Sequence, residues 1–240
     1  MVSIIANSGK IAKSEQTNEK IISTYLNLIH SKQWDKISVK ELCDCANIAR
    51  GTFYLYFNDI YDLMEQIETA LLEDIRRRYA KLPKKLPASF PPELFEDKFD
   101  YAPPESLLTW FDFCKAHKKK IVVLLDPKNG DTYFVKKLKV ILNEEINRMM
   151  DEDGMPHDWL RSHFTKIFVE LHFLSVRTWL ESKDDNFLSV NEIINLLNTM
   201  RVGANYLTYK KLSSPDFDAK MKHSEGIEHD YRNRDRHLKD

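Results

Sequence analysis

The stretch SVKELCDCANIARGTFYLYF, from Ser38 to Phe57, contains two short helical patterns separated by a tight turn. Ser38 is followed three residues later by Glu41, which fits the capping box that begins many helices. We expect this first helix to cover residues 39–46 and to end at Asn47, because asparagine tolerates the left-handed backbone of a turn. Two short helices joined by a three-residue turn are typical of a DNA-binding helix-turn-helix.

Five large side chains follow one another in the second helix, which is predicted to cover residues 50–57. At about 100° per residue, Phe53 and Phe57 share one face, and we expect both to pack into the core. Tyr54 rotates away from that face, and Tyr56 sits at its margin. Because tyrosine hydroxyls bind phosphate oxygens in protein–DNA complexes, these two tyrosines are candidate contacts to the DNA backbone.

The N-terminal end of the same helix carries Arg50 and Thr52. A recognition helix usually approaches the bases with this end. Arginine reads guanine through two hydrogen bonds, and the threonine methyl group can touch the methyl group of thymine. Arg50 and Thr52 are therefore the candidate base contacts.

The composition favours a soluble, mostly helical chain. Of its 240 residues, 42% are hydrophobic and 30% charged, with only 6 glycines and 9 prolines. The net charge of −1 gives no whole-chain signal for nucleic acid, so a DNA-binding surface must arise from local charge. We find no membrane-spanning run and no secretory signal, and three cysteines argue against a disulfide framework. A cytoplasmic location is the prediction.

Helical periodicity and proline positions divide the chain into segments. Further helices are predicted at residues 18–32, 60–79, 105–119 (with an extension to 125 left open), 132–151, 156–181 and 190–212. The segments are a loose polar N-terminal arm (1–16), a helix-turn-helix domain (17–59), a connecting helix (60–80), a C-terminal helical domain (81–212) beginning with a proline-rich loop (81–104), and a polar tail expected to be disordered (213–240). The predicted fold class is all-α.

The C-terminal helices are rich in aromatic residues. Ligand pockets are apolar with a few polar groups, but an ordinary core has the same composition, so a purely structural role stays an alternative at each position. The candidate pocket residues are Trp110, Phe113, Cys114, His117, Phe134 and His172.

Over about 50 residues the chain resembles the N-terminal domain of the TetR (tetracycline-repressor-like) transcriptional regulators. The match rests on SVKELC at 38–43 and GTFYLYF at 51–57, which follow the family's Thr/Ser-Val-x-x-Ile-Ala and Gly-Thr-x-Tyr-x-Tyr/His-Phe patterns. The C-terminal part is similar only in its layout. The DNA-facing positions that the resemblance implies are Ser38, Lys40, Arg50, Thr52, Tyr54 and Tyr56.

Three positions depart from the family pattern. Asn47 replaces a glycine, which the left-handed tolerance of asparagine absorbs. Ala49 replaces a serine, so the second helix loses a cap worth roughly 1 kcal/mol. Ile60 replaces a common lysine, which removes one phosphate contact and should lower the affinity for DNA.

The resemblance also implies a homodimer, in which the last two long helices of each subunit (156–181 and 190–212) form a four-helix interface. The candidate interface residues are Phe164, Ile167, Phe168, Leu171, Leu174, Ile193, Leu196, Leu197 and Met200.

We therefore expect a homodimeric repressor that binds a double-stranded DNA operator and is released by a small-molecule effector bound in the C-terminal domain. The alternative is a helical interaction protein of the same fold that is controlled by a protein partner. No glycine-rich phosphate loop, nucleophile motif or metal-spaced cluster is present, so we expect no enzyme activity, no cofactor and no metal site.

Overall fold

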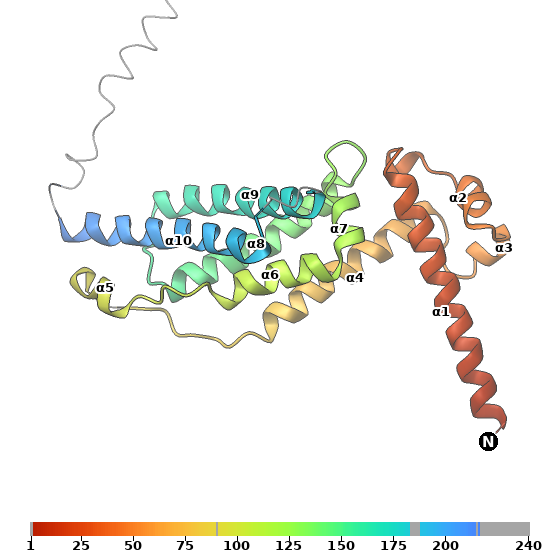
Figure 1. Ribbon diagram of the computed structural model, residues 1–240, viewed down its shortest axis with the longest axis horizontal. Coiled ribbons are helices and arrows are strands. Elements are labelled where there is room, and N and C mark those ends of the chain that lie inside the picture. Colours follow the sequence, from red (N-terminus) through yellow and green to blue (C-terminus); the bar gives the residue numbers. More distant parts are fainter. Residues whose placement is uncertain (1, 90, 183–187, 215, 217–240) are drawn as a thin grey trace, which may run out of the picture.

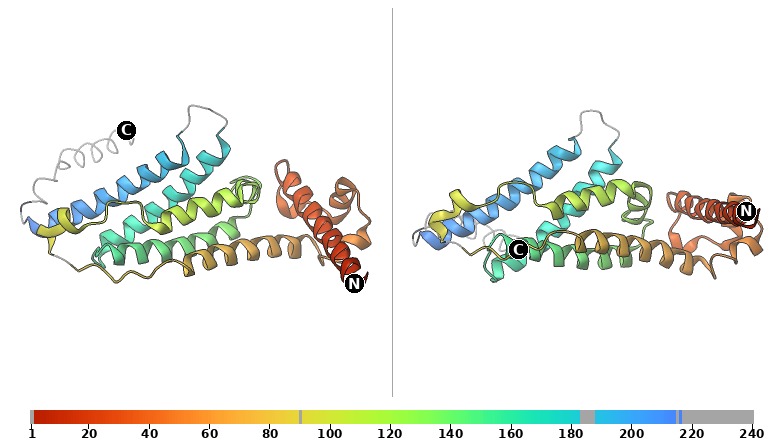
Figure 2. Two further views of the ribbon diagram at one scale, coloured as in Figure 1. Left: turned by 60° about the horizontal axis from the view of Figure 1, so that its bottom comes forward. Right: turned by 90° about the horizontal axis from the view of Figure 1, so that it is seen from below.

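The computed structural model describes residues 2–89, 91–182, 188–214 and 216, with backbone alone for 2–12. The described chain is all-α and contains no strand. Figures 1 and 2 show three N-terminal helices gathered at one end of an elongated molecule, with the long helix α4 leading from them into a bundle of helices. We call residues 2–59 the head and residues 81–214 the body.

The head consists of α1 (Val2–Ile29), a 3-10 turn (Trp34–Lys36), α2 (Val39–Ala46) and α3 (Arg50–Phe53). The predicted loose arm at residues 1–16 is wrong for residues 2–16, because α1 begins at Val2. This segment contains no proline and a single glycine, so its polar residues simply continue the helix toward its N-terminus.

The connecting helix α4 (Ile60–Ala80) joins the head to the body. Asp59 caps it, because its side chain accepts a hydrogen bond from the Asp62 backbone N–H at 2.8 Å. Ile60, which stands where related chains carry a lysine, is buried at the first position of α4. The departure from the family pattern therefore adds a core side chain to this helix.

The described residues of the body form one 3-10 turn (Pro92–Leu94) and six helices. The helices are α5 (Phe95–Lys98), α6 (Glu105–Ala116), α7 (Lys118–Leu124), α8 (Thr132–Glu152), α9 (Trp159–Glu181) and α10 (Val190–Ser213). The single helix left open to residue 125 is in fact two, because the chain bends at His117, where φ is −108° and ψ is 23°. The Asp158 carboxylate caps α9 by accepting a hydrogen bond from the Arg161 N–H at 2.8 Å. The helix therefore starts at Trp159, later than residue 156, where the sequence predicted it.

The proline-rich loop at 81–104 is not structureless, since it includes the 3-10 turn and α5. Arg201 on α10 anchors it: its Nη1 donates to the backbone oxygens of Asp100 and Ala102, at 3.2 Å each. The Arg201 side chain also pairs with the buried Asp153 carboxylate, with Nε 2.7 Å from Oδ2. The prediction of a disordered tail at 213–240 falls almost wholly outside the described residues.

One continuous cluster of buried apolar side chains runs from the head through α4 into the body. It includes Ile21 and Phe53 of the head, Ile67 of α4 and Trp110 of the body. Head and body therefore share this core, beside which Phe95, Phe99 and Tyr209 form a smaller cluster within the body.

Candidate nucleic-acid interface

The first helix of the motif, α2, begins with the predicted capping box. Ser38 Oγ accepts a hydrogen bond from the Glu41 N–H at 3.2 Å, and Glu41 Oε2 accepts from the Ser38 N–H at 3.5 Å. Lys32 Nζ also donates to Glu41 at 2.8 Å, and this hydrogen bond lowers the pKa of the Glu41 carboxyl. Ser38 thus fixes the start of α2, while the neighbouring Lys40 side chain is exposed.

The turn between the two helices has the predicted left-handed residue. Asn47 has φ 48° and ψ 56°, and it is the one described non-glycine residue with a positive φ. Its N–H donates to the Asp44 carbonyl at 3.2 Å, and the Ile48 N–H donates to the Cys43 carbonyl at 3.1 Å. Ile48 is half-buried against the core, so the turn holds α2 and α3 at a fixed angle.

The second helix is shorter than predicted. The α-helix ends at Phe53 rather than at residue 57, and the Leu55 and Tyr56 N–H groups bond three residues back, at 3.3 and 3.0 Å. The chain must turn here because the Asn58 N–H already donates to the Asp62 side chain of α4, at 2.7 Å. As expected, Ala49 supplies no capping hydrogen bond at the start of α3.

The aromatic run divides into buried and exposed side chains. Phe53 and Phe57 are both buried, with ring centroids 5.6 Å apart, as the periodicity predicted. Tyr54 is 57% exposed and Leu55 is 81% exposed. Tyr56 is half-buried, and its hydroxyl lies 3.1 Å from Ser14 Oγ on α1. The Tyr56 hydroxyl thus has a partner within the head, whereas Tyr54 projects freely.

The two candidate base contacts, Arg50 and Thr52, lie at the start of α3. Arg50 is exposed at the first position of the helix, and Thr52 is half-buried. Within the described residues, neither Arg50 nor Lys40 has an ion-pair partner. Their positive charges are therefore not neutralised by neighbouring carboxylates in the head.

The head is fixed to the body by a polar junction that the sequence did not reveal. The Trp34 N–H donates to the Asn129 carbonyl, and the Asn129 side chain donates to the His30 carbonyl, both at 3.3 Å. Glu68 of α4 is buried nearby and accepts from Lys137 of α8 at 3.2 Å. These contacts hold the head against the body in this conformation.

Five of the six residues predicted to line a ligand pocket are buried core residues. They are Trp110, Phe113, Cys114, Phe134 and His172. Burial lowers the pKa of the His172 imidazole to about 4, so it is neutral and its Nδ1 lies 2.7 Å from the Phe168 carbonyl. His117 is partly exposed and pairs instead with Asp74 of α4, with Nε2 2.9 Å from Oδ2. A cavity lies elsewhere, between α1 and α7.

The predicted interface residues lie at different depths in α9 and α10. Phe168, Ile193 and Leu197 are buried within the subunit, Phe164 and Leu171 are half-buried, and Met200 is exposed. The other three predicted contacts, Ile167, Leu174 and Leu196, are exposed. Leu160 on α9 and Leu207 on α10 are exposed as well and were not among the predicted contacts.

No described helix combines the length and apolarity needed to cross a membrane. No three or more His, Cys, Asp or Glu side chains in this part of the chain are placed to hold a metal ion.

Neither a protein-family model nor a curated protein sequence matches the chain. Several solved structures do match the fold of the chain. A TetR transcriptional regulator from Streptococcus agalactiae superposes with a TM-score of 0.53 at 17% identity, over 81% of this chain and 98% of that one. A TetR-family regulator from Streptomyces coelicolor gives a TM-score of 0.50 at 17% identity, over 93% of this chain and 97% of that one. The chain therefore has the all-helical fold of the TetR-family transcriptional regulators.

Proposed function

We propose that this protein is a dimeric DNA-binding repressor that uses α2 and α3 to bind a double-stranded operator. The observation that carries the proposal is the arrangement of α3. Phe53 and Phe57 fix it to the core. Arg50 is exposed and has no ion-pair partner among the described residues, and Tyr54 is exposed beside the Phe53 ring. A helix held rigidly from behind, with a free guanidinium at its N-terminal end, suits the major groove.

The contacts divide by chemistry. Arg50 and Thr52 are assigned to base edges, and Tyr54, Lys40 and Ser38 to phosphate oxygens. Tyr56 is also assigned to a phosphate oxygen. We expect this contact to be weaker than that of Tyr54, because the Tyr56 hydroxyl already bonds Ser14. The hydroxyl of Ser38 accepts the capping bond and still has its own proton to donate.

A two-fold dimer would present two heads to two half-sites. Support for it comes from the exposed apolar side chains on α9 and α10, of which Ile167 is 61% exposed. Exposed apolar patches on a soluble protein mark interaction surfaces. In this proposal Ile167, Leu174, Leu196 and Met200 meet the partner, and the buried Phe168 supports them from beneath. A small effector then favours a head orientation that does not fit the operator, so that its binding releases DNA.

The test is fluorescence anisotropy with a labelled fragment from upstream of the gene, at low salt. Arg50→Ala should weaken binding to the preferred sequence by about 1–3 kcal/mol and relax base preference. Tyr54→Phe should weaken binding to all sequences alike. Arg76→Ala is the control, because it removes the same charge from an exposed position on α4.

Two results would reject the proposal. A folded dimer that binds no DNA at low salt would rule out the repressor function. Identical behaviour of Arg50→Ala and Tyr54→Phe across an operator library would show that the assignment of base and phosphate contacts is wrong.

A further inference from the structure

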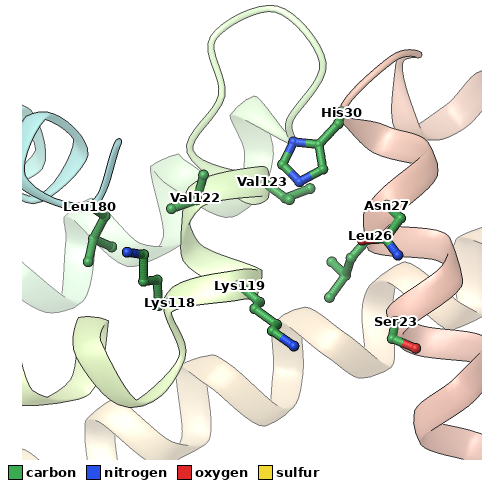
Figure 3. Close-up of a pocket in the computed structure, with 9 residues that line it drawn as sticks. All are labelled: Ser23, Leu26, Asn27, His30, Lys118, Lys119, Val122, Val123 and Leu180. Atoms are coloured by element: carbon green, nitrogen blue, oxygen red, sulfur yellow. The ribbon is translucent and has the colours of Figure 1, made fainter. Parts of the chain in front are cut away.

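A cavity of about 410 Å³ lies where the head meets the body, between α1 and α7. Its apolar part consists of Leu26 of α1, Val122 and Val123 of α7, and Leu180 near the end of α9. Figure 3 shows Leu26 reaching from α1 toward α7 across this space. Pockets of roughly 300–1,000 Å³ hold small organic molecules, so the volume suits a compact one.

The polar part of the same cavity is positively charged. Lys118 and Lys119 line it from α7, and the imidazole of His30 lines it from the turn directly after α1. Figure 3 shows the Lys119 ammonium extending toward α1, while the Lys118 side chain extends toward Leu180. Both lysines are exposed, and neither has an ion-pair partner among the described residues.

Two unneutralised ammonium groups beside an apolar surface favour one class of ligand. A carboxylate or sulfonate forms charge-assisted hydrogen bonds with lysine, and an attached hydrocarbon or aromatic group would cover the apolar part. Ser23 and Asn27 of α1 add polar groups along the same edge of the cavity. A cation would meet like charges here, and a purely apolar molecule would leave the ammonium groups without a partner.

We propose that this cavity binds a small organic anion with an apolar body and that its occupant is the effector of the protein. The second half of this inference rests on the proposed function. Because α1 belongs to the head while α7 and Leu180 belong to the body, an occupant would contact both parts. It would therefore bind one head orientation more tightly than another, which is the condition for shifting DNA affinity. The effector site then lies at the junction and not among the buried aromatic residues of the body.

The binding test uses two fluorescent probes of matched shape, 8-anilinonaphthalene-1-sulfonate, an anion, and N-phenyl-1-naphthylamine, which is neutral. Lys119→Glu should weaken the binding of the sulfonate at least tenfold and leave the amine unchanged. Lys120→Glu is the matched control, because Lys120 is adjacent on α7 but does not line the cavity. Val122→Trp, which fills the apolar part, should weaken both probes. Equal sulfonate affinity in Lys119→Glu and Lys120→Glu would overturn the site.

The coupling test adds the labelled upstream DNA fragment. Saturating sulfonate should weaken DNA binding at least fivefold in the wild type and in Lys120→Glu, with less than a twofold effect in Lys119→Glu. If sulfonate binds with the predicted Lys119 dependence but no DNA binds, the site stands and the repressor function fails. If DNA binds and the sulfonate affinity does not depend on Lys119, the function stands and the site is wrong. Unchanged DNA affinity with the cavity saturated would refute its role as the effector site.

Discussion

The Glu68 carboxylate on α4 accepts a hydrogen bond from Lys137 Nζ on α8 at 3.2 Å, although Glu68 is only 3% exposed. Burial and then the neighbouring Asp131 carboxylate raise the pKa of Glu68 to about 7 from 4.5, while Lys137 acts in the opposite direction. This ionisable group therefore titrates near neutral pH, at the place where the connecting helix meets the body.

Stability should consequently fall as the pH rises through this range. The folded chain holds the Glu68 proton more tightly than the unfolded chain, so the free energy of unfolding decreases between pH about 4.5 and 7. The loss reaches up to about 3 kcal/mol. Glu68→Gln should remove this contribution and be more stable than the wild type at pH 8. Urea unfolding at pH 5 and pH 8 measures it, with the exposed Glu65→Gln as control. An equal pH dependence in the wild type and Glu68→Gln would contradict the assignment.

Truncation of Phe53 and of Leu55, two positions apart, should affect the free energy of unfolding very differently. Phe53 is fully buried, so Phe53→Ala should cost about 3–5 kcal/mol of unfolding free energy. Leu55 is 81% exposed, so Leu55→Ala should change stability by less than about 0.5 kcal/mol. Thermal and urea unfolding of both variants provide the comparison, and similar losses would mean that α3 is not held as described.

The left-handed turn residue gives a backbone prediction. Asn47→Ala keeps a β-carbon at φ 48° but removes the polar side chain that can form local hydrogen bonds. This change should lower the free energy of unfolding by about 1–2 kcal/mol. Asn47→Gly should be close to neutral, since glycine adopts this conformation without steric conflict. Circular dichroism melting curves measure the difference. A Gly variant less stable than the Ala variant would show that the side chain, and not the backbone, matters here.

Arg201 should be essential for holding the proline-rich loop. Arg201→Met leaves the buried Asp153 carboxylate without its partner, which should cost about 3–5 kcal/mol. Adding Asp153→Asn should recover part of this loss, because the unpaired charge disappears. Urea unfolding of the two single variants and the double variant measures the coupling. Simple addition of the two single losses would argue against a shared network.

The dimer proposal predicts a loss of association from charges placed on the exposed face. Ile167→Asp combined with Leu196→Asp should give a folded monomer in analytical ultracentrifugation, because two charges would be buried in the interface. Leu86→Asp is the control, since Leu86 is 88% exposed in the proline-rich loop and belongs to neither α9 nor α10. A dimer that survives the double substitution would place the interface on another surface.

The helix-turn-helix could be predicted from sequence because its signals are local. The capping pair of Ser38 and Glu41, the left-handed Asn47 and the four-residue spacing of Phe53 and Phe57 all appear within one short stretch. Each depends on neighbours along the chain, and the structure has all three.

Features that depend on distant contacts could not be predicted. The bend at His117 comes directly before three lysines, with no glycine or proline beside it, and His117 pairs with Asp74, 43 positions away. The junction cavity combines side chains from α1, α7 and α9, which only the folded arrangement brings together. Trp110, Phe113 and Phe134, which were candidates for a ligand pocket, are buried in the core. Composition alone does not separate a core from a ligand site.

The continuous core has a consequence for how the molecule loses its structure. Ile60, Leu63 and Ile67 of α4 belong to the same buried cluster as Phe53 in the head and Trp110 in the body. A fragment cut before α4 would expose the inner surface of the helix-turn-helix, and so the head is not an autonomous folding unit. Heat or denaturant should melt both ends of the chain in one cooperative transition, although they serve different tasks.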